Sequence, residues 1–228
     1  MKQMALGVRL RTAAVFAGFA AGQNAELLAS LRGDSREPLW LWGNHGCGKT
    51  HLLQAACAAA GESAAYFPLE RTLGLPPAAL AGFERCRVLC IDDVDAVAGD
   101  LAWERALFRL FNEAAEYQSR VIFAAALPPR QIAWQLEDWQ SRAAACIVYQ
   151  VRELDEPGRA LALRLRAAQR GLDLPLETMD YLLKRMPRDL GSLFDLLDEL
   201  DEASLVAQRR LTIPFIRDAL EKRAKIKP

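Results

Sequence analysis

A glycine-rich stretch that ends in a lysine and a threonine is the feature of this sequence most able to do chemistry. Positions 43–50 read GNHGCGKT and fit the pattern G-x-x-x-x-G-K-[ST]. Glycines let several backbone N–H groups point at one phosphate, and the following helix presents its positive end to the same anion. Lys49 would neutralise the outer phosphates and the Thr50 hydroxyl would ligate Mg²⁺. The predicted nucleotide contacts are Gly43, Asn44, His45, Gly46, Cys47, Gly48, Lys49, Thr50 and His51.

Two aspartates follow an apolar run in the stretch RVLCIDD and complete this prediction. Ligands of open α/β sheets bind at the carboxyl ends of the strands, where Asp92 and Asp93 would lie. Asp92 is expected to hold Mg²⁺, directly or through water, together with Thr50. Asp93 is a candidate for orienting an attacking water. Alone, the run could end in a solvated acidic turn, but its occurrence after a phosphate loop favours the metal site. His45 and His51 are expected to pack or to hydrogen-bond, because no carboxylate lies near them in sequence.

The elements that must position these residues alternate between short apolar runs and helical patterns, which is typical of a parallel sheet covered by helices on both faces. From about Pro157 the sequence reads as consecutive amphipathic helices with no strand between them. We therefore predict an α/β nucleotide-binding domain (11–156), a small all-α domain (157–228) and a disordered N-terminal peptide (1–10). The five expected strands are Leu39–Trp42, Ala64–Pro68, Arg87–Ile91, Val121–Ala126 and Cys146–Val151.

The composition gives the chain no net charge that would attract it as a whole to nucleic acid or to an acidic membrane. The 29 Lys and Arg residues balance 29 Asp and Glu residues among 228 residues, so any DNA contact would be local. Arg9 and Arg11 precede an apolar run that resembles a signal peptide, but the pattern continues into the predicted nucleotide site. No apolar stretch reaches the roughly 18 residues of a membrane span. The five cysteines are expected to be buried thiols, and the chain to be cytoplasmic.

The residues so far resemble those of the bacterial replication initiator DnaA and its relatives among the AAA+ ATPases. The resemblance rests on LWLWGNHGCGKTHLLQAAC and VLCIDDVDAVAGD, and it continues through YFPLE, LAWERALFRLFNEA, LPPRQI and FAGFAAGQNAELL. Within this family the stretch LFDLLDELDEASLVAQRRLTIPF is most similar to the branch that inactivates DnaA. The resemblance implies an AAA+ domain followed by a helical lid. Because the chain stops at Pro228, after the lid, we expect no helix-turn-helix domain and no direct sequence-specific DNA binding.

The resemblance also assigns roles that spacing alone does not. Arg142, in DWQSRAAA, resembles the arginine finger that reaches the nucleotide of a neighbouring subunit, and Arg188, in MPRDLGSLF, resembles the sensor 2 arginine. A lone arginine is otherwise a solvated surface charge. Near the N-terminus QMALGV resembles the peptide that binds the DNA polymerase III sliding clamp. In it Gln3 would supply hydrogen bonds, and three side chains would fill apolar pockets: Met4, Leu6 and Val8.

One departure from the family concerns hydrolysis. Ala124, Ala125 and Ala126 stand where the family places a polar sensor 1 residue, and alanine has no hydrogen-bonding side chain. The resemblance therefore implies a protein that holds ADP, or ATP with Mg²⁺, hydrolyses it poorly unaided, and uses Arg142 to promote hydrolysis of ATP on DnaA while bound to the clamp. Self-association stays open. The alternatives are a self-sufficient DnaA-like ATPase or loader, an adaptor that only docks DnaA to the clamp, and a nucleotide kinase.

Overall fold

The chain divides into two compact units in a computed structural model that describes residues 14–185, 190–207 and 211–226. The first unit contains Asn24–Arg152. The second unit contains the chain from Glu153 onward, together with the earlier segment Ala17–Gln23. None of the helices in the described ranges is both long enough and apolar enough to cross a membrane.

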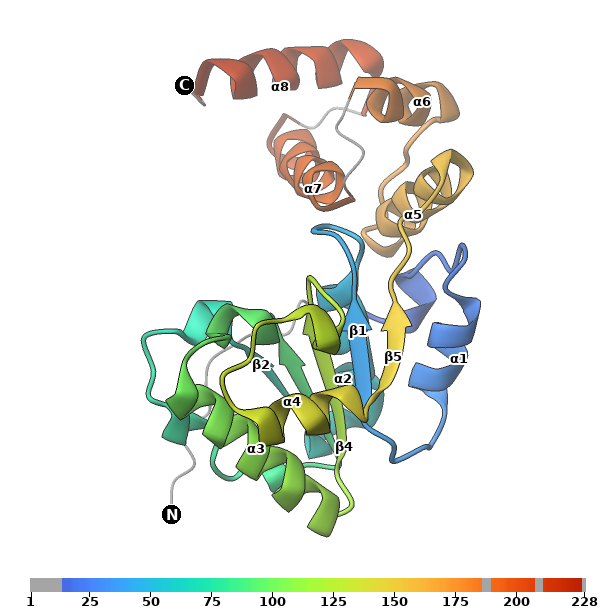
Figure 1. Cartoon of the computed structure of the whole chain (residues 1–228). Coiled ribbons are helices and arrows are strands. Elements are labelled where there is room, and N and C mark those ends of the chain that lie inside the picture. The colour runs from blue at the N-terminus through green and yellow to red at the C-terminus, as the bar shows by residue number, and fades with distance from the viewer. Residues whose placement is uncertain (1–13, 186–189, 208–210, 227–228) are drawn as a thin grey trace. The chain divides into compact units, whose positions relative to one another are not determined.

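A parallel sheet of five strands forms the centre of the first unit (Figure 1). The strand order is β2-β3-β4-β1-β5, and every neighbouring pair is parallel, which confirms the predicted fold class. Strands β3 and β4 begin one residue away from the predicted positions, because Arg120 pairs with Val88 in the ladder. The bounds are β1 Leu39–Trp42, β2 Ala64–Pro68, β3 Val88–Asp92, β4 Arg120–Ala125 and β5 Ile147–Gln150.

Helices cover both faces of this sheet. Helix α2 packs on β2, β3 and β4, whereas α3 packs on β4 and α4, in front of the sheet in Figure 1. Helix α3 ends at Glu116, and two residues later Gln118 adopts a positive φ of 55° that is incompatible with a continuing helix. The helices of this unit are α1 Ala25–Arg32, α2 Lys49–Ala60, α3 Leu101–Glu116 and α4 Glu137–Ala144. The 3₁₀ turns are η1 Phe16–Gly18, η2 Gly61–Ser63, η3 Glu70–Thr72, η4 Pro77–Leu80, η5 Phe83–Arg85, η6 Val94–Val97 and η7 Pro129–Gln131.

An aromatic cluster fills the core between the sheet, α3 and α4. Trp139, on α4, is fully buried, and its ring lies 5.4 Å from that of Phe123 on β4 and 5.8 Å from that of Trp134. Edge-to-face ring pairs of this kind add specificity to the burial of apolar area. Four of the five cysteines are buried as predicted, whereas Cys86 is partly exposed because it lies in the turn that precedes β3.

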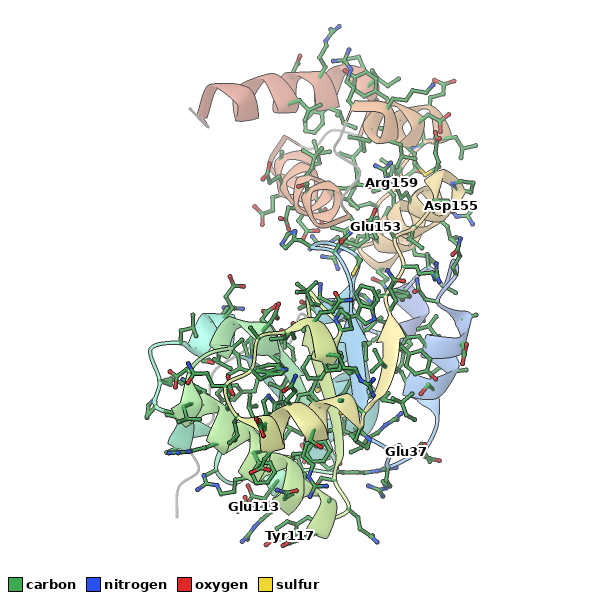
Figure 2. All side chains as sticks on the ribbon, in the orientation of Figure 1. Glu37, Glu113, Tyr117, Glu153, Asp155 and Arg159 are labelled. Atoms are coloured by element: carbon green, nitrogen blue, oxygen red, sulfur yellow. The ribbon has the colours of Figure 1, made fainter. Side chains whose placement is uncertain are left out.

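The second unit is helical, as predicted. Asp155 caps α5 by accepting a hydrogen bond from the Gly158 N–H at 2.9 Å, and both Asp155 and Arg159 are labelled near the start of this helix in Figure 2. Arg166, on α5, and Arg170, the C-cap residue of α5, form ion pairs with Asp198, on α7, at 3.0 and 2.8 Å. The four helices are α5 Glu156–Gln169, α6 Leu176–Arg185, α7 Leu190–Ala207 and α8 Ile213–Ile226.

A buried carboxylate fixes the start of α4. Glu104, on α3, is fully buried and accepts hydrogen bonds from the backbone N–H groups of Gly99 at 2.8 Å, Gln135 at 2.9 Å and Leu136 at 2.7 Å. Leu136 is the N-cap residue of α4 and its own side chain cannot cap the helix. Glu104 therefore attaches α4 to α3 and to the turn that follows β3.

Replacing Glu104 with alanine is expected to lower the free energy of unfolding by about 3 kcal/mol, because three backbone N–H groups lose their hydrogen bonds to a fully buried carboxylate. Urea unfolding followed by tryptophan fluorescence measures this, since all five tryptophans lie in the first unit. The control is Glu113→Ala, because Glu113 lies on the outer side of α3 (Figure 2) and pairs with Arg109 at 3.9 Å. Its loss is expected to change stability by less than about 0.5 kcal/mol. Equal effects of the two variants would contradict the role of Glu104.

Candidate functional site

The glycine-rich stretch forms a tight loop between β1 and α2. Gly46 and Gly48 adopt positive φ angles of 77° and 106°, which side chains with a Cβ rarely adopt. At Gly43 an added Cβ would lie 2.6 Å from the carbonyl oxygen of Val151, so the loop passes too close to the backbone after β5 for any side chain. Helix α2 begins at Lys49, directly after the loop. The backbone is thus shaped as a phosphate site at a helix N-terminus requires.

The Lys49 ammonium group lies over this loop. It donates hydrogen bonds to the carbonyl oxygens of Gly43 at 2.7 Å and Asn44 at 3.0 Å. A lysine ammonium has three N–H donors, so one donor is left to bind a ligand. The position is therefore suited to neutralising a phosphate held by the loop.

Asp92 receives two side-chain hydroxyl groups on one carboxylate oxygen. Thr50 and Tyr66 both donate to Asp92 Oδ2, at 2.7 and 2.8 Å, and the Asp93 N–H donates to Oδ1 at 3.2 Å. Asp92 is only 1% exposed. Hydroxyl and carboxylate oxygens are the ligands that Mg²⁺ prefers, and Mg²⁺ usually takes one or two of them together with substrate phosphates. The side chains of Thr50 and Asp92 therefore fit a magnesium ion.

Electrostatics differ between the two aspartates. Burial raises the pKa of Asp92, and the hydrogen bonds from Thr50 and Tyr66 partly offset this. Burial, followed by the negative charge of Asp92, raises the pKa of Asp93 to about 6. Asp93 adopts a left-handed backbone conformation, with φ 54° and ψ 45°, which turns the chain away from β3. Such strain at the carboxyl end of a strand is typical of functional positions.

The carboxyl end of β4 contributes no polar side chain to this edge. Ala124 and Ala125 are fully buried, and Ala125 pairs with Trp42, the residue before the loop. The N–H of Ala126 donates to Asp95 Oδ2 at 3.0 Å. The group beside the end of β4 is thus a carboxylate, which would repel a terminal phosphate rather than stabilise it.

The other predicted residues are distributed more widely. Arg142 lies on α4 and is exposed, and no described residue pairs with its guanidinium group. His45 is exposed in the loop, whereas His51 Nε2 hydrogen-bonds with the Val15 carbonyl oxygen at 3.1 Å. Arg188 and the four predicted clamp-binding residues, Gln3, Met4, Leu6 and Val8, lie outside the described residues.

Tyr66 is a site residue that the sequence analysis missed. Burial is the main reason that the pKa of this tyrosine is raised well above its usual value, so it remains a hydroxyl donor to Asp92. The sequence did hold a signal for Tyr66. It is a tyrosine in the apolar run that became β2, and a long polar-tipped side chain there can reach the carboxyl end of β3, where Asp92 lies. Tyr66 is paired in register with Cys90, two residues before Asp92.

Comparison with known proteins finds one matching family model and several solved structures with the same fold. Residues 156–220 match the protein family described as "Hda, lid domain". The chain is similar to domain III of the Thermotoga maritima replication initiation protein DnaA, with a TM-score of 0.77 and 20% identity over 96% of this chain and 100% of that one. It is also similar to the replication initiator DnaA bound to AMPPCP and single-stranded DNA (TM-score 0.69, 21% identity, 95% of this chain and 71% of that one). The Thermotoga maritima RuvB Holliday junction branch migration motor gives a TM-score of 0.61 at 14% identity, over 81% of this chain and 61% of that one.

The raised pKa of Asp93 predicts how the stability of the fold changes with pH. Well below the ordinary Asp pKa of about 3.9 the carboxyl is protonated in both the folded and the unfolded state. As the pH rises to about 6, the unfolded chain releases this proton first, so ionisation of Asp93 destabilises the fold progressively. The stability of Asp93→Asn relative to the unsubstituted chain is therefore expected to grow between pH 4 and 7, as measured by urea unfolding. A carboxyl NMR titration should give a midpoint near 6, and a midpoint near 4 would contradict the buried environment.

Proposed function

We propose that this chain, an AAA+ protein related to DnaA with an Hda-type lid domain, is a negative regulator of replication initiation that promotes hydrolysis of ATP bound to DnaA. The observation that carries the proposal is the exposed guanidinium group of Arg142, which pairs with no residue in the described ranges. It lies on a helix that Glu104 attaches firmly to the core. An arginine offered in this way can act on a nucleotide held by another protein.

In this proposal the chain's own site binds a nucleotide and hydrolyses it poorly. The loop N–H groups and Lys49 hold the phosphates of ADP or ATP, and Thr50 and Asp92 hold Mg²⁺, which supplies charge neutralisation when bound. The alanines that end β4 leave the outer phosphate without a polar contact from that strand. Bound ADP would then set the arrangement of the lid through Arg188, whose role comes from the family resemblance.

Arg142 would supply what a neighbouring nucleotide lacks. Its planar and permanently charged guanidinium group can donate two hydrogen bonds to a phosphoryl group as charge develops on it. Transition-state stabilisation of this kind acts on the ATP of DnaA and not on the nucleotide of this chain. The N-terminal peptide would restrict the reaction to sliding clamps loaded on DNA, in the cytoplasm and without sequence-specific DNA contacts by this chain.

Replacing Arg142 with alanine is expected to reduce the stimulated hydrolysis of DnaA-bound ATP at least 100-fold, since an arginine finger contributes about 10³ to 10⁵ in rate. The measurement follows radiolabelled ATP on DnaA in the presence of this chain, ADP and DNA-loaded clamp. Arg105→Ala is the matched control, because Arg105 is also an exposed arginine without a described partner, but lies on α3. Full stimulation by the Arg142 variant would exclude the proposed role and favour an adaptor that only docks DnaA to the clamp.

Replacing Gln3 with alanine is expected to weaken binding of the chain to the isolated clamp at least tenfold, because the peptide loses its hydrogen-bonding side chain. Nucleotide affinity should be unchanged, since the phosphate loop is a separate element. Surface plasmon resonance with immobilised clamp measures the first, and a fluorescent ADP titration the second. Unaltered clamp binding would refute the assignment of residues 3–8.

A further inference from the structure

A small polar cavity lies at the amino ends of β3 and β4, at the opposite end of these strands from Asp92. Its volume is about 40 Å³, and its lining includes three arginines, Arg36, Arg87 and Arg120, together with Asp34 and Ser35. A single water needs roughly 10 to 15 Å³ of such space, so the cavity can accept a group of several atoms. The three guanidinium groups come from three separate segments: the α1–β1 loop, the residue before β3 and the first residue of β4.

Arg120 provides a fixed positive charge at this cavity. It is 5% exposed, and its guanidinium group donates hydrogen bonds to the carbonyl oxygens of Gly33 and Ser30, both at 2.8 Å, at the end of α1. Its Nε has no hydrogen-bond partner in the described part of the chain. Burial lowers the pKa of Arg120, and the positive charge of Arg36 lowers it further. A nearby anion would relieve both effects.

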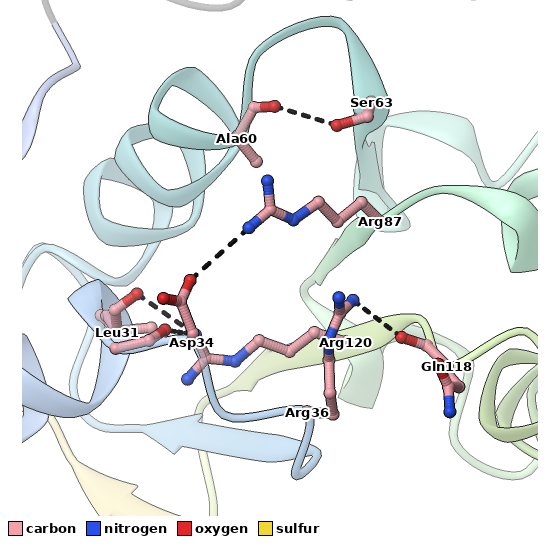
Figure 3. Close-up of polar contacts among 9 residues, drawn as sticks. Leu31, Asp34, Arg36, Ala60, Ser63, Arg87, Gln118 and Arg120 are labelled. Atoms are coloured by element: carbon pink, nitrogen blue, oxygen red, sulfur yellow. Dashed lines mark hydrogen bonds and ion pairs between the residues drawn. The ribbon is translucent and has the colours of Figure 1, made fainter.

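Arg36 and Arg87 carry the donors that could reach such an anion. Arg36 uses Nη1 to bind the Gln118 carbonyl oxygen at 2.9 Å, and Arg87 uses Nη2 to approach Asp34 at 3.5 Å (Figure 3). The remaining N–H groups of these two arginines have no partner among the described residues. Among the lining residues the carboxylate is that of Asp34, whose side chain is 97% exposed, against three guanidinium groups, and Glu37 lies nearby, bonded to Ser35 at 3.2 Å. The lining therefore keeps an excess of positive charge.

We propose that this cavity binds a phosphate group, held mainly by Arg36 and Arg87 and attracted by the fixed charge of Arg120. A phosphate is tetrahedral and presents oxygens in several directions, so the exposed guanidinium groups of Arg36 and Arg87, from separate segments, can both donate to it. A carboxylate has two oxygens in one plane and would match one guanidinium fork. The occupant is either a free phosphate or the terminal phosphate of a nucleic acid, which share this chemistry.

The site is independent of the predicted nucleotide site, and the proposal does not depend on the function proposed above. Gly33 and Arg36 lie in the loop that joins α1 to β1, Arg87 precedes β3, and Arg120 is the first residue of β4. Phosphate bound there would hold these segments together. We therefore expect phosphate to raise the melting temperature of the first unit, as well as to bind.

The test is calorimetric titration of inorganic phosphate into the full chain with excess ADP present, so that the phosphate loop is filled. The double variant Arg36→Gln, Arg87→Gln is expected to bind phosphate at least tenfold more weakly. Both side chains are exposed, so the variant should retain the melting temperature of the unsubstituted chain without phosphate. Arg85→Gln is the matched control, because Arg85 lies in the same segment but pairs with Glu84 and stacks on Tyr117. Its affinity should stay within twofold.

Three results would overturn the proposal: absence of saturable phosphate binding, equal binding by the double variant, or equal competition by acetate at the same ionic strength. Lys49→Ala, titrated in the same way, is expected to bind phosphate as the unsubstituted chain does. If Lys49→Ala loses phosphate binding while the double variant keeps it, the anion lies in the phosphate loop and not in the cavity. An oligonucleotide with a 5′-phosphate, compared with its dephosphorylated form, distinguishes the two sources. Competition by the first alone indicates a nucleic-acid end, and competition by neither indicates a free phosphate.

Discussion

The buried carboxylate of Asp92 is the constraint on which the arrangement of the candidate site depends. An isolated carboxylate costs several kcal/mol to bury, so it must be satisfied by hydrogen bonds. Thr50 from α2 and Tyr66 from β2 supply them to one oxygen, and the Asp93 N–H supplies one to the other. These bonds join α2 to β2 and β3, and so fix the first turn of α2 relative to the sheet. The glycine loop that leads into that turn is positioned as a result.

At this edge of the sheet the residues that fit a nucleotide are present, whereas β4 contributes no polar side chain that could assist hydrolysis. The loop, Lys49 and Asp92 provide what a bound nucleotide and its metal need, whereas β4 ends in alanines and the adjacent group is the carboxylate of Asp95. The proposed action on another protein's ATP follows from this asymmetry, because the exposed Arg142 lies on a helix of the same unit. Glu104 connects that helix to Gly99, in the segment that follows Asp92. A buried hydrogen-bond network of this kind can hold an exposed arginine in a defined place.

Much of this fold follows from the sequence, because the decisive signals are local. The glycine spacing, the two aspartates after an apolar run and the alternation of elements predicted the loop, Asp92 and the parallel sheet. Glu104 and Arg120 could not be found in this way, because charged residues are usually exposed and their partners here are backbone groups far away in sequence. The observed starts of β3 and β4 differ by one residue from the predicted ones for a similar reason. Backbone pairing between Val88 and Arg120 sets these starts, and the apolar character of the side chains does not reveal it. Arg142 needed the family resemblance, because spacing alone gives an exposed arginine no role.

The most direct test of the central claim is to determine whose ATP is hydrolysed. Two mixtures of this chain, DnaA and DNA-loaded clamp are prepared with the same total nucleotide, and radiolabelled ATP is placed beforehand on DnaA in one and on this chain in the other. Single-turnover release of labelled phosphate is then followed in both. The account predicts rapid release when the label is on DnaA and little release when it is on this chain. Rapid release from this chain, with the label on DnaA retained, would contradict it and favour a self-sufficient ATPase.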